Sequence, residues 1–154
     1  MDAGAQIDEH YLRLALALAQ EAESGEEVPV GAIIVLNDEI VGRGKNSPIL
    51  TNDPTAHAEI LALREASQNV GNYRLTGATL YSTLEPCVMC AGALVSARIQ
   101  RLVFGARDLR FGGVRSKFRL ADSDILNHRV EVIEGVLAAE CSELLRDFFL
   151  KRRT

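Results

Sequence analysis

The amino-acid sequence predicts an α/β fold, a three-layer α/β/α sandwich built on a mixed five-stranded sheet. Three observations lead to this prediction. Apolar, β-branched segments alternate along the chain with longer segments rich in alanine and leucine. The first two expected strands are separated only by Asn37-Asp38, which is typical of a hairpin and makes the sheet mixed. Helical segments separate the second, third and fourth expected strands, as expected for layers of helices on the sheet.

The first third of the chain predicts a helix followed by the hairpin. Residues 8–24 lack proline, glycine and β-branched side chains, and their alanine content favours a helix over a strand. Residues 28–36 and 39–45 are the two expected strands of the hairpin. Residues 46–54 contain Pro48 and Pro54 and are expected to form a loop.

The remaining elements follow from the same patterns. We expect strands at 79–84, 101–105 and 130–133, and helices at 55–68, from Cys87 or Val88 to about Ala97, and at 137–151. The stretch 106–127 is irregular and basic. With 154 residues and 47% hydrophobic residues, we expect one domain, residues 1–154. No long apolar run and no basic leader is present, so we expect a cytoplasmic protein without a membrane segment.

The charge is unevenly distributed. The net charge is −4, but residues 1–97 carry −8 and residues 98–154 carry +4. Two interpretations are open for the basic half: a solvated protein surface, or a surface that binds an anionic partner. A protein that coats DNA is not expected at a pI of 5.4.

Two short segments have the composition of a catalytic metal site. One contains His57 and Glu59, and the other contains Cys87 and Cys90 after Glu85-Pro86 at an expected helix start. Two thiolates and an imidazole suit zinc and leave a fourth position for water, whose pKa zinc lowers to about 7. Glu59 could then move the proton of that water, although on an ideal helix His57 and Glu59 point to nearly opposite faces.

Each part of this pattern has a simpler interpretation. A Cys-x-x-Cys pair is often a redox pair or half of a structural zinc site, and Cys141 or His128 could supply a fourth ligand. Cys141 is more typical of a small core residue, and Glu59 alone would be a solvated helix residue. The combination of His-x-Glu with Pro-Cys-x-x-Cys, each at a helix start, is far more specific than either part.

The combined pattern resembles the zinc-dependent cytidine and nucleobase deaminases. Within them, nearly the whole chain, from about residue 8 to 153, resembles the bacterial tRNA-specific adenosine deaminases. The segments that carry this resemblance are 28–32, 46–48, 53–63, 72–75, 83–93, 104–108, 127–129 and 148–153. The segment 109–126 departs from the family pattern, since it is more basic and aromatic, with Arg110 and Phe111 among its residues.

The resemblance implies a cytidine-deaminase-like fold and a defined reaction, the hydrolytic deamination of adenosine to inosine at the wobble position of an arginine tRNA anticodon. It implies that a zinc-bound hydroxide attacks purine C6, with release of ammonia. The implied roles are zinc ligation, one ion per subunit, by His57, Cys87 and Cys90, and proton transfer by Glu59. The implied substrate contacts are Asn46, Ala58, Asp108, Asn127, Phe149, Arg152 and Arg153.

The implied partners are the anticodon stem-loop of a tRNA and a second copy of the chain, with no membrane and no DNA as natural substrate. Core packing is the alternative for Phe149 and its neighbour Phe148, of which one is expected to pack and one to point outward, because adjacent residues cannot share a face. A frayed terminus is the alternative for Arg152 and Arg153. Two rival functions also remain open: deamination of a free base or nucleotide, and a non-catalytic zinc domain that binds RNA or a partner.

Overall fold

The structure, a computed structural model that describes residues 2–152, contains one five-stranded sheet in the order β2-β1-β3-β4-β5. The β1–β2 and β1–β3 pairs are antiparallel, and the β3–β4 and β4–β5 pairs are parallel, so the sheet is mixed as predicted. The strands are β1 (Gly31–Leu36), β2 (Glu39–Lys45), β3 (Thr79–Leu84), β4 (Arg101–Ala106) and β5 (Glu131–Glu134). The helices are α1 (Ala3–Ser24), α2 (Pro48–Thr51), α3 (Ala58–Val70), α4 (Val88–Ser96) and α5 (Ala138–Arg152).

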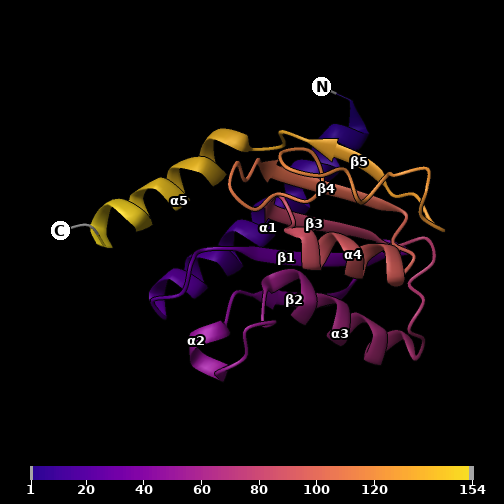
Figure 1. The fold of residues 1–154 in the computed structure, drawn as a ribbon, viewed down its shortest axis with the longest axis horizontal. Coiled ribbons are helices and arrows are strands. Elements are labelled where there is room, and N and C mark those ends of the chain that lie inside the picture. The colour runs from indigo at the N-terminus through magenta and orange to yellow at the C-terminus, as the bar shows by residue number, and fades with distance from the viewer. Residues whose placement is uncertain (1, 153–154) are drawn as a thin grey trace.

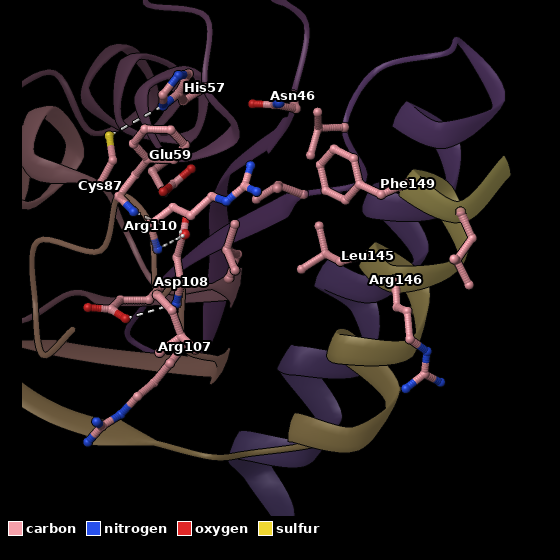
Figure 2. Close-up of a pocket in the computed structure, with 17 residues that line it drawn as sticks. Asn46, His57, Glu59, Cys87, Arg107, Asp108, Arg110, Leu145, Arg146 and Phe149 are labelled. Carbon is pink, nitrogen blue, oxygen red and sulfur yellow. Dashed lines mark hydrogen bonds between the residues drawn. The ribbon is translucent and has the colours of Figure 1, made fainter. Parts of the chain in front are cut away.

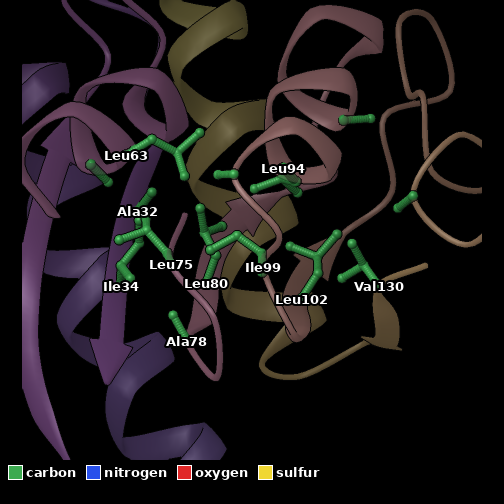
Figure 3. Packing of buried hydrophobic residues seen from close by; sticks show 14 of the residues in the cluster. Ala32, Ile34, Leu63, Leu75, Ala78, Leu80, Leu94, Ile99, Leu102 and Val130 are labelled. Atoms are coloured by element: carbon green, nitrogen blue, oxygen red, sulfur yellow. The ribbon is translucent and has the colours of Figure 1, made fainter. Parts of the chain in front are cut away.

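Helices cover both faces of the sheet, which confirms the three-layer prediction (Figure 1). On one face, α3 and α4 bury alanine and leucine side chains against the strands, as in the packing of Leu63, Leu80, Leu94 and Leu102 (Figure 3). On the other face, α1 packs on β1 and β3, and α5 packs on β4. Removal of this apolar surface from water is the main force that holds the layers together.

The hairpin forms where the sequence predicts it. Asn37 and Asp38 both have positive φ, at 52° and 63°, which is the conformation of a two-residue turn that matches the twist of paired strands. The first strand is shorter than expected, since β1 begins at Gly31 and the expected strand at residue 28.

Three helices differ from the sequence prediction, and one of them is α3, which begins at Ala58 and not at residue 55. Helix α1 begins at Ala3 and not at residue 8, because the Asp2 side chain accepts a 2.7 Å hydrogen bond from the Ala5 N–H and caps an earlier start. The expected loop 46–54 contains the short helix α2, which begins at Pro48, a residue whose fixed φ suits a first helical turn. The start of α1 depends on a capping hydrogen bond and the start of α2 on a proline in its first turn, and hydrophobic periodicity reports neither.

The topology brings the candidate site residues to one edge of the sheet. Parallel strands β3 and β4 end side by side, so Glu85–Cys87 after β3 and the long segment 107–130 after β4 leave the sheet together. Helix α3 packs closely on β2 at Gly44, a residue without a Cβ atom. A Cβ atom at this position would collide with the backbone of Ala58 and Ala62. In the described part of the chain, no helix is both long enough and apolar enough to cross a membrane.

Candidate metal and catalytic site

The two sequence motifs meet at the starts of two helices. His57 precedes the first residue of α3 and Cys87 precedes the first residue of α4, both in extended conformation with ψ of 151° and 179°. Because His57 lies outside α3, the helical angle between positions 57 and 59 does not apply. The conflict expected from the helix spacing of His57 and Glu59 is therefore absent, and both side chains line one pocket.

The three expected ligands fit a zinc ion. Nδ1 of His57 lies 3.5 Å from Sγ of Cys87 and 3.5 Å from Sγ of Cys90. Tetrahedral zinc, with Zn–S near 2.3 Å and Zn–N near 2.0–2.1 Å, places such atoms about 3.5–3.6 Å apart. The ligand atoms of all three residues lie within 4.8 Å of one another, and no other group of three potential ligands occurs in residues 2–152.

The helix start also favours a thiolate at Cys87. A hydrogen bond from Cys90 and another from His57 lower the pKa of the Cys87 thiol to about 4, against the opposing effect of burial. The hydrogen bond between the two cysteines has the opposite effect on Cys90. This hydrogen bond to Cys87, together with burial, raises the pKa of the Cys90 thiol. A deprotonated sulfur is the form that binds a metal.

The alternative fourth ligands lie elsewhere. A ring nitrogen of His128 lies 2.7 Å from the backbone oxygen of Ile99. Cys141 is buried with Leu16 and Ala106 on the opposite face of the sheet from α3 and α4. The residues described therefore offer three protein ligands, which is the number found in catalytic zinc sites and not in closed structural ones.

Glu59 is a buried carboxyl group and not a solvated helix residue. Its side chain lines the pocket, and only 4% of the residue is exposed. Burial raises the pKa of Glu59 to about 7, against the opposing effect of its own backbone N–H and of His57. A carboxyl with a pKa near neutrality can both accept and release a proton at physiological pH.

A pocket of about 830 Å3 opens over these residues (Figure 2). Three of the predicted substrate contacts, Asn46, Asp108 and Phe149, line it, and their contact with substrate stays a prediction. Of the two adjacent phenylalanines, Phe148 is 4% exposed and Phe149 is 47% exposed, so one packs and one points outward as predicted. The remaining lining residues are Val28, Val30, Leu84, Glu85, Arg107, Leu109, Arg110, Phe111, Leu145, Arg146 and Leu150.

Other expected substrate contacts lie outside this pocket. Ala58, the first residue of α3, is fully buried in the core and does not line the pocket. The backbone oxygen of Asn127 accepts a 3.0 Å hydrogen bond from Arg98. Arg152 donates to the backbone oxygen of Glu26, and its guanidinium lies 4.1 Å from the centre of the Phe148 ring. Arg153 lies outside the described residues, and the roles of all four in RNA binding stay predictions.

Most of the basic side chains after residue 97 have internal partners. Arg101 pairs with Asp8, Arg107 with Glu134, and both Arg115 and Arg119 with Asp122. The net charge of +4 on residues 98–154 is therefore larger than the positive charge that is available to bind an anion. Among residues 98–119 of the described chain, only Arg110 and Lys117 have side-chain charges without a hydrogen-bond or ion-pair partner.

Sequence reasoning did not include several pocket residues. Arg110 and Phe111 belong to the segment 109–126, which departs from the family pattern. The basic and aromatic composition of that segment was the sequence feature that could have indicated a place at the pocket. Leu145 and Arg146 lie four and three residues before Phe149 on α5, so helical spacing from Phe149 would have found them. In Figure 2, Arg110 reaches across the pocket toward Asn46 and Phe149, a position that no sequence pattern indicated.

Comparison with known proteins agrees with this geometry. Residues 5–106 match the family model of the cytidine and deoxycytidylate deaminase zinc-binding region. The fold and the three ligands with their buried carboxylate thus define a zinc-dependent deaminase.

The relatives narrow the family further. The chain is 53% identical over 149 residues to the tRNA-specific adenosine deaminase of Haemophilus influenzae, covering 96% of this chain and 86% of that protein. A solved structure from studies of A-to-I editing by tRNA:A34 deaminases is 43% identical, with a TM-score of 0.85, covering 88% of this chain and 99% of that one. The chain belongs to the family of the bacterial tRNA-specific adenosine deaminases. The guanine deaminase of Nitrosomonas europaea shares the fold alone, at 24% identity and a TM-score of 0.79 over 91% of this chain and 83% of that one.

Proposed function

We propose that the protein converts adenosine to inosine at the wobble position of a tRNA anticodon, in an arginine tRNA, by hydrolytic deamination. The observation that carries the proposal is the buried Glu59 carboxyl beside His57, Cys87 and Cys90 in an open pocket. Relatives that are 53% and 44% identical to this chain are named tRNA-specific adenosine deaminases. The reaction replaces the C6 amino group of the purine with an oxygen from water and releases ammonia.

In this proposal the protein residues divide into holding and proton-transfer roles. His57, Cys87 and Cys90 would hold zinc, which when bound supplies a Lewis acid for activating water. Glu59 accepts a proton from the attacking water and donates it to the purine ring nitrogen N1, and it then accepts the proton of the new C6 hydroxyl and donates it to the departing amine. The net change is the loss of the bond between C6 and its exocyclic amino nitrogen, and the gain of a C6–O bond.

The same pocket supports recognition of a base that has left its stack. The side-chain amide of Asn46 can hydrogen-bond the edge of an adenine, and the Ala58 backbone is proposed to help hold it. An anticodon loop presents its bases unstacked at little cost, which suits an enzyme that must reach the pairing edge. Asp108 and Phe149, together with Arg110 and Phe111, line the pocket, and we propose that they contact the neighbouring nucleotides.

Residues outside the pocket would act farther along the RNA. Asn127, Arg152 and Arg153 are proposed to contact the stem-loop beyond the wobble nucleotide. We further propose a cytoplasmic single-domain enzyme that works as a homodimer. Exposed apolar side chains on α2 and α4 support a second copy as partner, with Ile49 71% and Leu50 77% exposed.

The test compares substrates side by side. The protein is incubated with an arginine tRNA anticodon stem-loop, its DNA counterpart, free adenosine and free guanine, and both ammonia and inosine are measured. Inosine in the stem-loop alone is the expected result. Ammonia from a free base, with an unchanged stem-loop, would favour the small-substrate alternative. A zinc-loaded protein that releases no ammonia from any substrate would favour the non-catalytic one.

A further inference from the structure

The buried carboxylate of Glu85 is the centre of a group of hydrogen bonds, here called the hub. It lies between the metal-binding segment, residues 87–90, and the pocket wall, residues 108–111. Glu85 is 1% exposed and lies directly after β3. One oxygen accepts hydrogen bonds from the Asp108 N–H at 3.0 Å and from the Ser116 hydroxyl. The other accepts from the N–H groups of Val114, Arg115 and Ser116 at 3.1, 2.7 and 2.9 Å. Five donors from one loop thus converge on a single side chain.

The backbone of the same loop lies against the start of α4. Cys87 and Gly112 form an isolated antiparallel bridge, and the Gly113 N–H donates to the Pro86 oxygen at 2.8 Å. A Cβ atom on Gly113 would lie 2.9 Å from the backbone N and Cα of Val88, and one on Gly112 would collide with the carboxylate of Glu85. The loop is therefore fitted onto the metal-binding segment with no space for larger residues.

The residues that this hub holds in place include part of the pocket wall. Asp108, whose N–H is bound by Glu85, accepts hydrogen bonds at 3.1 Å on its own side chain from the N–H groups of Arg110 and Phe111. Residues 108–111 all line the pocket. A chain of hydrogen bonds therefore runs from Glu85, two positions before Cys87, through Asp108 to the backbone of Arg110 and Phe111. In Figure 2, Asp108 lies on one side of the pocket and Phe149 on the other.

We propose that Glu85 is a positioning residue of this site, which fixes the wall 108–111 relative to the metal ligands and so sets how the nucleotides around the reacting base are held. The inference rests on the proposed function. Glu85 touches neither the reacting atoms nor the metal ligands' side chains, and it acts through Asp108. An ionised carboxylate accepts all five hydrogen bonds, whereas an amide would turn an NH2 group toward N–H donors and leave several buried donors unpaired.

The test compares Glu85→Gln with Ser116→Ala, which removes one hydrogen bond only, and with Glu131→Gln as an exposed control. Four quantities are measured: zinc per chain, thermal melting, the rate of tryptic cleavage after Arg110, Arg115 and Lys117, and kcat and KM on the stem-loop. For Glu85→Gln we expect retained zinc, faster loop cleavage and a KM raised about tenfold or more, with a smaller change in kcat. Ser116→Ala should shift KM and cleavage in the same direction by less.

Other outcomes would overturn the inference. An unchanged KM and an unchanged cleavage rate in Glu85→Gln would show that the hub positions nothing. If Glu85→Gln loses zinc and unfolds while Ser116→Ala behaves as wild type, Glu85 has a purely structural role. If the wild-type protein deaminates a free base and not the stem-loop, the proposed function fails, and the cleavage rate and the KM for that base still test the positioning role of Glu85.

Discussion

Nδ1 of His57 lies 3.5 Å from Sγ of Cys87, and each residue is the one that precedes the first turn of a helix. Neither side chain caps its helix, so both are free to bind a metal. The amino-terminal ends of two helices, α3 and α4, also meet here, and their dipoles favour negative charge on the sulfurs. The site therefore depends on where two helices begin more than on any single residue.

The first prediction concerns metal content. Cys87→Ala and His57→Ala should each lower zinc well below one ion per chain, because two ligands no longer hold the ion in competition with water. Cys141→Ser is the matched control, since Cys141 is buried on the other face of the sheet. Elemental analysis of the purified proteins measures this, and zinc retained at one ion per chain in Cys87→Ala would contradict the ligand assignment.

The second prediction separates proton transfer from metal binding. Glu59→Gln keeps the shape of the buried side chain but removes its ability to accept a proton, so turnover should fall by a factor of about 100 or more while zinc is retained. Glu39→Gln, on the exposed start of β2, serves as control and should behave as wild type. Single-turnover inosine formation is the measurement. Near-normal turnover in Glu59→Gln would remove Glu59 from the mechanism.

The third prediction tests the aromatic rim of the pocket. Phe111 is 66% exposed although it lines the pocket, and we expect it to stack on a nucleotide beside the reacting base. Base stacking on an aromatic side chain is worth ~1–3 kcal/mol, so Phe111→Ala should raise KM for the stem-loop about tenfold. Phe118→Ala is the control, because Phe118 is 57% exposed but lies outside the pocket lining. Equal KM values in the two variants would contradict the stacking role.

Hydrophobic pattern was enough to predict most of the fold. The hairpin turn at Asn37-Asp38, the strand β3 and the order of layers follow from periodicity and turn composition, which are local properties. The start of α1 and the presence of α2 depend on the Asp2 cap and on Pro48 in a first turn, which periodicity does not detect. A capping hydrogen bond decided the first case, and the fixed φ of a proline decided the second.

The site divides in the same way. The three candidate metal ligands and Glu59 could be named from the sequence because they lie in two short motifs. The partners of Arg101, Arg107 and Arg115 lie seven to ninety-three residues away in sequence, so counting charge could not show that these cations are paired. Arg152 was expected at the RNA, but its position against Phe148 and Glu26 depends on how α5 packs near α1. The hub at Glu85 is likewise a tertiary arrangement.

The last prediction concerns the face of the sheet opposite the pocket, where the Tyr81 hydroxyl donates a 2.9 Å hydrogen bond to Asp8, which Arg101 also binds. Burial and the hydrogen bond to Asp8 raise the pKa of Tyr81 above its ordinary value of 10.0. Because the folded pKa is the higher one, this contribution to stability is fully present below about pH 10 and is lost as the pH rises through the folded pKa.

Tyr81→Phe should lower the free energy of unfolding by ~1–2 kcal/mol near neutral pH, and this deficit should shrink in alkaline solution. Urea unfolding of both proteins from about pH 8 to pH 11 measures the difference, with the exposed Tyr73→Phe as control. A deficit that stays constant across this range would show that the Tyr81 proton is not linked to folding.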